Sequence, residues 1–290
     1  MILLLGGTGF VGQEFQRYLQ AQGIAYRNVC RSECDYTDKG QLNMLIQELK
    51  PEFLINCAGY TGKPNVDACE LQRADCLAGN AVLPGTIREV CEDAGLTWGH
   101  VSSGCIYTGR RKDGAGFTEE DEPNFSFRNN NCSFYSGTKA LGEEVLEGAE
   151  NCYVWRLRIP FNHKDSPRNY ISKLMRYDCI LEAENSISHL DEFVSACWQT
   201  IEKRVPVGIY NMTNSGSVLS SEVAEMAKTI LKLDRDFEYF ANETDFMAKA
   251  AKTPRSNCVI DNSKLLATGI KIPEVHEALE RSLNGWIWEE

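Results

Sequence analysis

Two side chains at helical spacing are the first residues in this sequence whose types suggest a reaction. Tyr135 and Lys139 lie four positions apart in SFYSGTKALGEE, so a helix there would place both on one face. An ammonium group beside a phenol favours the phenolate, which lets the tyrosine donate or accept a proton near neutral pH. The same lysine can also bind the ribose of a nucleotide. The spacing alone is weak evidence, because many surface helices carry such a pair.

A serine and a cysteine follow a predicted strand in the stretch SSGCIY. Ser103 carries a hydroxyl group, and Cys105 carries a thiol whose reactivity depends on its ionisation. The chain has twelve dispersed cysteines, and most of them are expected to be small, buried residues with reduced thiols. Cys105 is therefore open to two interpretations, a packed core residue or a catalytic group.

A glycine-rich turn lies between the apolar run MILLL and a periodic helix. In GGTGFVG, Gly6, Gly9 and Gly12 have the spacing that lets backbone amides approach a pyrophosphate at the positive end of a helix. Phe10 and Val11 belong to the same turn. The stretch predicts a dinucleotide site, and the alternative is a glycine turn needed only for packing.

The end of the second predicted strand bears on the choice of cofactor. An acid there binds the ribose of NAD, whereas an arginine suits the 2'-phosphate of NADP. The stretch NVCRSE presents Arg31 first, with Glu33 as the competing acid, and Asp35 follows in DYTD. NADPH is therefore expected, with NADH as the other option. Ala58, in NCAG, is also expected at the cofactor.

Strands and helices alternate through the first half of the chain, which predicts a doubly wound, Rossmann-type parallel α/β sheet. Helices are expected near 80–94 and 136–148. The dinucleotide-binding domain is expected over 1–158, with an added strand from about 205–215, and 159–290 mainly as a smaller substrate-binding α/β lobe. The expected strands after the first are 24–29, 52–59, 96–102 and 152–158.

Composition excludes several classes of protein. The formal charge is −11, with 30 basic against 41 acidic residues, which disfavours nucleic acid as a partner. Five apolar residues before Gly6 are too few for a signal peptide, and no later run suits a membrane span, so a cytoplasmic protein is expected. No CxxC motif occurs and the four histidines are far apart in sequence, so no metal site is expected.

These motifs together resemble the extended short-chain dehydrogenase/reductase family. Within it, the chain is most similar to the dTDP-4-dehydrorhamnose reductase branch, and in particular to the plant-type bifunctional 3,5-epimerase/4-reductases that act on UDP-4-keto-6-deoxyglucose in UDP-rhamnose synthesis. The resemblance covers almost the whole chain. Its most specific segments are TGKPNVDACE (61–70), SGCIY (103–107), GFTEEDEPNF (116–125), SFYSGTK (133–139), SPRNYISKLMRY (166–177) and TPRSNCVIDNSKL (253–265).

The resemblance implies an NADPH-dependent 4-reductase for a nucleotide-linked 4-keto-6-deoxyhexose, with epimerisation before reduction. It assigns the carbonyl and proton chemistry to Ser103, Tyr135 and Lys139. GDP-fucose synthase, a relative with similar chemistry, uses the cysteine of SxCIY as a base, which implies that role for Cys105, with Lys173 of YISKL as the partner acid. The packing interpretation of Cys105 remains, with Lys173 as a solvated helix residue.

The substrate is expected to be a nucleotide sugar, and a homodimer is the assembly considered. Arg255, together with Arg168 and Asn169, is expected at the pyrophosphate, because guanidinium groups match phosphate oxygens, and Asn65 completes the substrate contacts. Surface arginines beside prolines are the alternative. Two other functions stay open, a 4-reductase without epimerase activity and a regulatory subunit that binds the dinucleotide without turnover.

Overall fold

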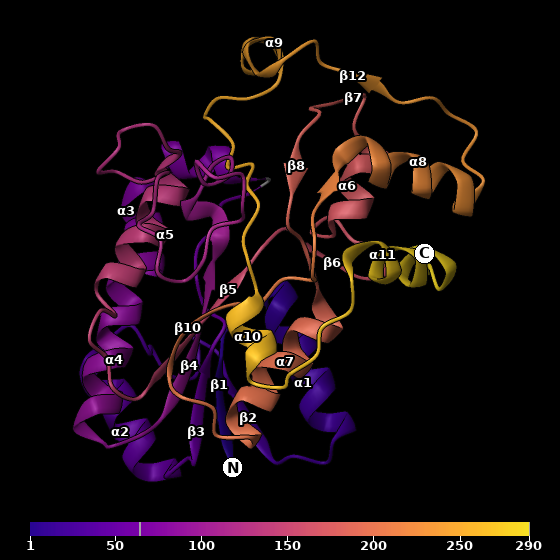
Figure 1. The fold of residues 1–290 in the computed structure, drawn as a ribbon. Coiled ribbons are helices and arrows are strands. Elements are labelled where there is room, and N and C mark those ends of the chain that lie inside the picture. The colour runs from indigo at the N-terminus through magenta and orange to yellow at the C-terminus, as the bar shows by residue number, and fades with distance from the viewer. Residues whose placement is uncertain (64, 290) are drawn as a thin grey trace.

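The computed structural model describes residues 1–63 and 65–289, and its centre is one parallel sheet (Figure 1). Six strands pair in the order β10-β5-β4-β3-β1-β2, all parallel. The order reverses between β1 and β3, the place where doubly wound sheets bind nucleotides. The strands are β1 (Ile2–Leu5), β2 (Tyr26–Val29), β3 (Phe53–Asn56), β4 (Trp98–Ser103), β5 (Cys152–Leu157) and β10 (Gly208–Asn211).

Alternate residues of each strand face opposite sides of the sheet and build two hydrophobic cores. Ile2 and Leu4 pack toward α1, α7 and α10, whereas Leu3 and Leu5 pack toward α2 and α4. Helices cover both faces, which confirms the predicted Rossmann-type fold (Figure 1). These helices are α1 (Phe10–Ala21), α2 (Lys39–Leu49), α3 (Arg73–Leu77), α4 (Leu83–Asp93), α5 (Phe134–Glu144), α7 (Leu190–Glu202) and α10 (Ser263–Ala267), with the shorter η1 (Val66–Glu70), η2 (Ala78–Val82) and η3 (Gly104–Ile106).

The second half of the chain contributes to both parts of the molecule. β10 pairs with β5, and α7 packs on the sheet through Phe193 and Val194. A helix as well as a strand from this half therefore belongs with the sheet. The smaller lobe has its own core, built mainly from α6, α8 and α11. Its elements are β6 (Pro160–Phe161), α6 (Tyr170–Arg176), β7 (Cys179–Ile180), β8 (Glu184–Asn185), β9 (Ser188–His189), β11 (Val218–Leu219), α8 (Ser220–Leu231), β12 (Glu238–Tyr239), α9 (Glu243–Lys249) and α11 (Val275–Asn284).

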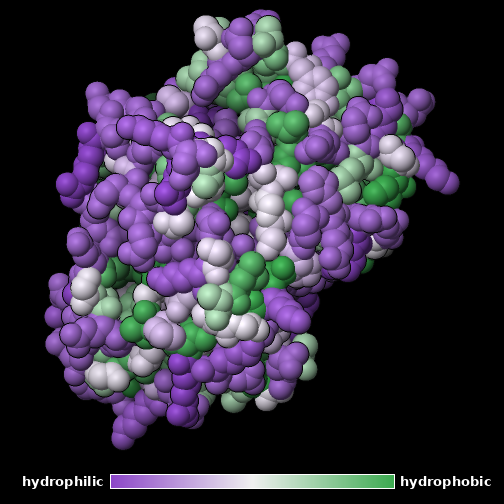
Figure 2. Space-filling model, in the orientation of Figure 1, coloured by the Kyte–Doolittle hydropathy of each residue, from purple (hydrophilic) through white to green (hydrophobic). Residues whose placement is uncertain are grey.

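The face of the molecule shown in Figure 2 is largely polar, with several small, separate apolar areas. Within residues 1–63 and 65–289, every helix is too short or too polar to cross a bilayer. None of the twelve cysteines, all of which the structure describes, forms a disulfide bond.

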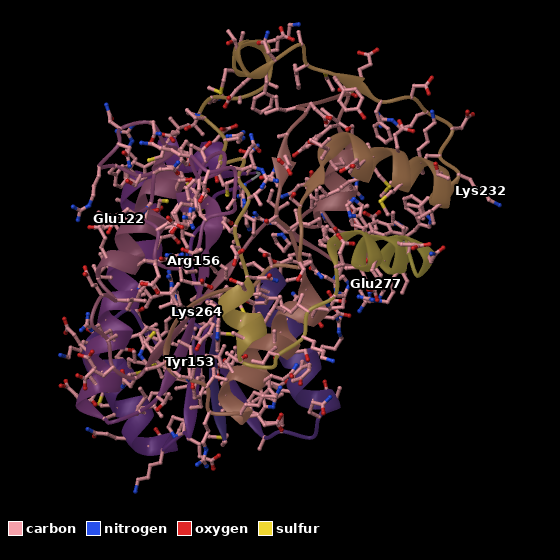
Figure 3. The ribbon with its side chains drawn as sticks, viewed as in Figure 1. Glu122, Tyr153, Arg156, Lys232, Lys264 and Glu277 are labelled. Atoms are coloured by element: carbon pink, nitrogen blue, oxygen red, sulfur yellow. The ribbon has the colours of Figure 1, made fainter. Side chains whose placement is uncertain are left out.

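A buried ion pair ties α5 to the sheet. Arg156 of β5, labelled in Figure 3, lies 2.8 Å from Glu143 of α5, and both side chains are more than nine-tenths buried. The Ser102 hydroxyl donates to Glu143 at 2.6 Å, and Arg156 donates to the Tyr107 hydroxyl at 3.1 Å. Because α5 carries Tyr135, this network sets the distance of that tyrosine from the end of β4.

Removing one charge of this pair is expected to destabilise the protein strongly. Glu143→Gln leaves Arg156 buried without a counter-charge, which costs about 3–5 kcal/mol of unfolding free energy. Urea denaturation followed by circular dichroism measures the loss. Glu144→Gln is the matched control, since its partner Arg128 is largely exposed and such pairs contribute about 1 kcal/mol at most. Equal stabilities of the two variants would contradict this account.

Candidate active site

Ser103 and Tyr135 lie together at the carboxyl end of the sheet. Ser103 ends β4, and Tyr135 lies in the first turn of α5, which begins where Ser133 accepts a hydrogen bond from the Ser136 amide. Burial raises the pKa of Tyr135 well above its ordinary value, the Cys105 thiol adds to the rise, and the nearby Ser103 hydroxyl opposes it. The phenol is therefore protonated at neutral pH.

Lys139 lies one turn further along α5 and is 5% exposed. Its Nζ donates to the backbone carbonyl of Val101 at 3.3 Å, and burial lowers its pKa. The sequence predicted that Lys139 would favour the phenolate of Tyr135. In the structure, burial acts on the phenol in the opposite direction and raises its pKa, so the effect of Lys139 on Tyr135 stays a prediction. Tyr135 is thus arranged as a proton donor.

Cys105 lies in η3, directly after β4, and is 6% exposed. Its backbone amide donates to the Ser103 hydroxyl oxygen at 3.3 Å. Burial raises the pKa of the thiol, while the Ser103 hydroxyl and the charges of Arg158 and Lys139 oppose that rise. The cysteine is therefore buried, as the packing interpretation expected, and also lies in the Ser103–Tyr135 cluster, as the catalytic interpretation expected.

Lys173 lies on α6 in the smaller lobe and is half-buried. Burial lowers its pKa, and the adjacent Arg168 lowers it further. The nearby cations that act on the Cys105 thiol are Arg158 and Lys139, and no hydrogen bond joins Cys105 to Lys173 among the residues described. Two groups that act on opposite faces of a sugar ring are separated by that ring, so direct contact between them is not required.

The glycine turn has the shape that a pyrophosphate needs. Gly6 has a φ of 74°, and a Cβ there would lie 2.4 Å from the Ala58 nitrogen, so β1 and β3 end in close contact. A Cβ at Gly12 would lie 2.3 Å from the Gly6 oxygen, whereas Gly9 has more room. The first turn of α1 holds no acidic residue, which leaves its positive end free for an anion. These residues fit a dinucleotide.

Three other expected cofactor contacts are limited to the backbone or to small side chains. Phe10 and Val11 pack their side chains against the core on one face of the sheet, so only their amides face the turn. Ala58 follows β3, and its amide donates to the Asn56 side chain at 3.0 Å. A small residue at this position leaves space beside Gly6.

The segment after β2 carries the exposed cation Arg31, whose charge helps to lower the pKa of the nearby Asp35 carboxyl. Arg31 is exposed, lies 5.7 Å from the Tyr36 ring centre and forms no ion pair within residues 1–63 and 65–289. Glu33, its competitor for the ribose, is held by Arg27 at 2.7 Å. Asp35 accepts hydrogen bonds within its own turn. The geometry therefore favours a phosphate at Arg31 over a ribose hydroxyl at Glu33.

Arg31→Ala is expected to weaken NADPH binding about 10- to 100-fold, because a charged hydrogen bond contributes about 1.5–3 kcal/mol. NADH binding should change little, since it lacks the 2'-phosphate. Fluorescence titration of both nucleotides measures this, with Arg27→Ala as the control for loss of a neighbouring charge. Equal losses for the two nucleotides would place Arg31 away from the phosphate.

The two arginines expected at the substrate reach across from the smaller lobe to the segment that follows β3. The Arg255 guanidinium binds both carboxylate oxygens of Asp67, at 2.6 and 2.9 Å. Arg168 donates to the Thr61 hydroxyl at 3.2 Å. Asn65 is exposed and caps η1 by accepting from the Asp67 amide at 2.8 Å. Both cations thus lie at the boundary between the lobes, where an anionic ligand would meet them.

Asn169 does not have the free side chain that a ligand contact needs. It is fully buried, and its oxygen accepts from the Ile171 amide at 3.1 Å. Its nitrogen donates to the carbonyl oxygens of Asn162 at 2.8 Å and Lys164 at 2.7 Å. This corrects the expected substrate contact, because Asn169 instead holds the start of α6, the helix that bears Lys173.

The fold also brings together two histidines that are distant in sequence. One ligand atom each of His163, His189 and Asp191 lies within 4.8 Å of the others. The separation of the histidines along the sequence therefore did not prevent two of them from lying together in the fold. Asp191 is already bound by Arg17 of α1 at 2.8 Å, and burial lowers the pKa of His189 to about 4. In this structure the group is a partly buried ion-pair network between α1 and α7.

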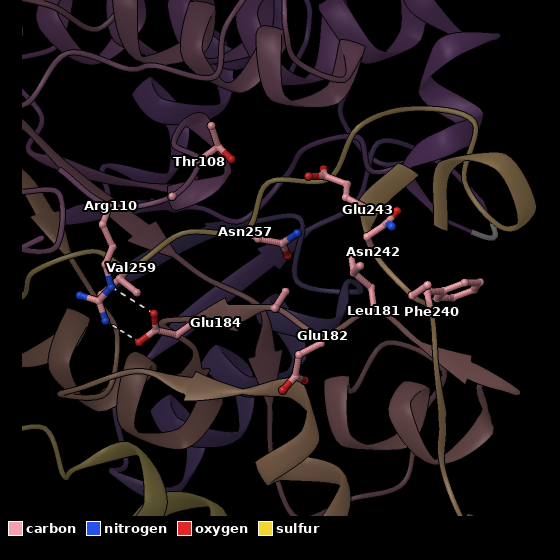
Figure 4. Close-up of a pocket in the computed structure, with 13 residues that line it drawn as sticks. Thr108, Arg110, Leu181, Glu182, Glu184, Phe240, Asn242, Glu243, Asn257 and Val259 are labelled. Carbon is pink, nitrogen blue, oxygen red and sulfur yellow. Dashed lines mark hydrogen bonds and ion pairs between the residues drawn. The ribbon is translucent and has the colours of Figure 1, made fainter. Parts of the chain in front are cut away.

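A pocket of about 560 Å³ lies between the segment that follows η3 and the smaller lobe (Figure 4). It is bounded by Thr108 to Arg110 on one side and by residues 181–184 and 240–243 of the smaller lobe on the other. An ion pair between Arg110 and Glu184 closes one end. None of the residues expected to be catalytic lines this pocket.

The family of the chain follows from its match over nearly the full length. The family model described as "RmlD substrate binding domain" matches residues 1–286. The chain belongs to the RmlD substrate binding domain family.

Two curated relatives in Arabidopsis thaliana indicate which RmlD-family proteins are similar. The bifunctional dTDP-4-dehydrorhamnose 3,5-epimerase/dTDP-4-dehydrorhamnose reductase is 34% identical over 96% of this chain and 90% of its own length. A trifunctional UDP-glucose 4,6-dehydratase/UDP-4-keto-6-deoxy-D-glucose 3,5-epimerase/UDP-4-keto-L-rhamnose-reductase is 35% identical over 96% of this chain, which spans 40% of that relative.

Solved structures of RmlD-type proteins share the fold. The UDP-rhamnose synthase L780 of Acanthamoeba polyphaga mimivirus superposes with a TM-score of 0.90 at 23% identity, covering 98% of each chain. A dTDP-4-dehydrorhamnose reductase of Bacillus anthracis, solved in complex with NADP, superposes with a TM-score of 0.78 at 18% identity, covering 97% of this chain and 96% of its own.

Sequence reasoning missed two residues of this RmlD-family site. Asp67 pairs with Arg255, and Arg158 lies beside Cys105. Asp67 could have been noticed in the sequence because it lies two residues after Asn65, an expected substrate contact. For Arg158 the signal was a charged residue directly after the strand CYVWRL, in which five of the six residues are apolar.

Proposed function

We propose that this chain uses NADPH to reduce the C4 carbonyl of a nucleotide-linked 4-keto-6-deoxyhexose, after inverting C3 and C5 of the same sugar. The observation that carries the proposal is the grouping of Ser103, Tyr135, Lys139 and Cys105 at the carboxyl edge of the sheet, the edge that also carries the glycine turn. Membership of the RmlD family and similarity to an epimerase/reductase over nearly the whole chain support it.

In the reductive step, the chain must deliver a proton to the C4 oxygen. The Ser103 hydroxyl donates a hydrogen bond to that oxygen and polarises the carbonyl. Tyr135, protonated at neutral pH, transfers its phenolic proton, and the Lys139 charge stabilises the phenolate that remains. NADPH, when bound, supplies the hydride that forms the new C–H bond.

Epimerisation uses the acidity of the C–H bonds at C3 and C5, both alpha to the C4 carbonyl. The Cys105 thiolate removes the proton, so an S–H bond forms, the C–H bond breaks and the electron pair moves onto the C4 oxygen. Ser103 and Tyr135 hold the resulting enolate by hydrogen bonds. Lys173 returns a proton to the opposite face of the ring, which restores the carbonyl with inverted configuration and no net redox change.

The nucleotide of the substrate is placed at the boundary between the lobes, where Arg168 and Arg255 supply guanidinium groups to its pyrophosphate. Arg255 is bound by the Asp67 carboxylate in the structure. A phosphate can replace a carboxylate at a guanidinium because both offer two oxygens to the same fork of donors. Substrate binding would therefore release Asp67.

The test is to incubate the purified protein in D2O with NADPH and either UDP- or dTDP-4-keto-6-deoxyglucose. NADPH absorbance follows reduction, and NMR assigns the product. A rhamnose configuration with deuterium at C3 and C5 is the expected result. No NADPH consumption with either nucleotide would contradict the proposal as a whole.

Two other outcomes correspond to the alternatives. A 6-deoxy product with unchanged C3 and C5 would indicate a reductase without epimerase activity. A protein that binds NADPH but turns over neither sugar would indicate the regulatory subunit. The presence of Ser103, Tyr135 and Lys139 in one cluster favours an enzyme, because a subunit that only binds the dinucleotide needs no proton donor.

A further inference from the structure

Arg158 is a buried cation without a buried anion to balance it. It follows β5 and is 4% exposed. Its terminal nitrogen donates to the Asn185 side-chain oxygen and the Ser256 backbone carbonyl, both neutral. Its Nε has no hydrogen-bond partner, and no carboxylate within residues 1–63 and 65–289 forms an ion pair with it.

A second buried arginine, which lies inside β5, shows how this protein pairs a buried charge with a carboxylate. Arg156, two residues earlier, has the Glu143 carboxylate at 2.8 Å. A buried guanidinium without such a partner is costly, since desolvation is not repaid by attraction to an anion. The difference between Arg156 and Arg158 therefore points to an anion that forms near Arg158 only during the reaction.

The surroundings of Arg158 identify that anion. A Cβ added to Gly104 would lie 3.3 Å from the Arg158 Cδ, so the arginine packs against the backbone next to Cys105. Its charge opposes the rise in the Cys105 pKa that burial causes. The other titratable groups that face this thiol are Tyr135, Lys139 and Cys132, from α5 and the segment before it.

We propose that Arg158 is a positioning residue that stabilises the thiolate of Cys105 and so increases the fraction of this base that is ready to take a ring proton. The proposal rests on the epimerase part of the proposed function. Arginine suits this task because its guanidinium stays protonated at any physiological pH. It therefore holds a fixed charge beside the thiol without exchanging protons with the sugar.

Lys139 cannot fill this role alone. It also acts on the Cys105 thiol, but burial lowers its own pKa and its charge is needed beside Tyr135 when the phenol loses its proton. With a separate cation at Arg158, the thiolate and the phenolate each have a positive neighbour. The two chemical steps then depend on different residues, which makes them separable by mutation.

The experiment measures the ionisation of Cys105 directly. Wild type, Arg158→Gln, Arg158→Met and Arg158→Lys are alkylated with iodoacetamide over a range of pH, and mass spectrometry of peptides reads the rate at Cys105 alone. The neutral variants are expected to react at least about tenfold more slowly at pH 7, because an opposite charge at short range shifts a pKa by a unit or more. Their rates should recover at higher pH, and Arg158→Lys should stay near wild type.

A second readout connects the charge to the reaction. In the neutral variants, deuterium exchange at C3 and C5 should fall about tenfold or more at pH 7 and move to higher pH, as the thiol does. Reduction of an already epimerised 4-keto sugar should stay within about threefold, because Ser103, Tyr135 and Lys139 are unchanged. A purely structural role would lower both activities together and leave the pH profiles in place.

Arg235→Met is the matched control. Arg235 also donates to neutral backbone carbonyls, of Met175 at 2.7 Å and Tyr177 at 2.8 Å, but it lies away from Cys105. Gln keeps a donor for Asn185 and Ser256, so Arg158→Gln tests the charge even if Arg158→Met does not fold.

An unchanged alkylation profile at Cys105 in folded Arg158→Gln would overturn the proposal. Absence of sugar exchange in the wild type would instead contradict the epimerase function, while the alkylation profile would still decide the role of Arg158.

Discussion

Tyr135→Phe is expected to lower the rate of NADPH-dependent reduction by about 100- to 10,000-fold, the usual effect of losing a general acid. The phenol supplies the proton that the C4 oxygen needs, and burial keeps that proton on Tyr135 at neutral pH. Phenylalanine fills the same volume, so α5 and its network with β5 should remain. NADPH affinity should change by no more than about threefold, since the glycine turn and Arg31 are untouched.

The rate is measured by NADPH absorbance with the 4-keto sugar, and affinity by fluorescence titration. Tyr18→Phe is the control for removing a phenol from a partly buried position elsewhere in the molecule. Turnover within about tenfold of wild type in Tyr135→Phe would assign the proton to another group, because general-acid loss costs more than this.

Cys105→Ser is expected to abolish deuterium incorporation at C3 and C5, with a loss of about 100- to 10,000-fold, while reduction of an epimerised ketone persists. Serine keeps the size of the side chain but is a much weaker base than a thiolate. Burial raises the pKa of Cys105, and the nearby charges of Arg158 and Lys139 oppose this rise, so the thiol is the group here that can be adjusted toward ionisation.

Lys173→Met should impair the same exchange if Lys173 is the partner acid. Burial and Arg168 both lower the Lys173 pKa, which makes its ammonium a better proton donor than a solvated lysine. Cys91→Ser and Lys203→Met are matched controls, the first for a hydroxyl at a buried cysteine position and the second for loss of an exposed lysine. Exchange at nearly the wild-type rate in both Cys105→Ser and Lys173→Met would make Cys105 a packing residue.

Local patterns in the sequence predicted the parts of the fold that depend on neighbours along the chain. The apolar runs became β1, β3, β4 and β5, and the glycine turn connects β1 to α1. Boundaries moved by a few residues, as for α5, predicted over 136–148 and observed over Phe134–Glu144. The helix starts early because Ser133 caps it, a side-chain hydrogen bond that apolar periodicity does not report.

The site was less accessible to such reasoning because its members come from distant segments. Asn169 looked like a ligand contact beside Arg168, yet its amide is used entirely within its own turn and by Asn162 and Lys164. Asp67 was overlooked although it holds Arg255. The sequence shows that a polar side chain can form hydrogen bonds, but the packing of the folded chain determines which group it binds.

The sequence by itself determined the doubly wound sheet, the dinucleotide turn and the Tyr135–Lys139 pair, because each depends on spacing within a single strand, turn or helix. Only the tertiary structure decided the burial of Tyr135, the pairing of Arg255 with Asp67 and the charge beside Cys105. Burial and charge–charge distance control those properties, and both arise when segments far apart in the chain pack together. Arg156, inside β5, and Arg158, directly after it, illustrate the limit: the sequence does not show that a carboxylate pairs with Arg156 but, among the described residues, not with Arg158.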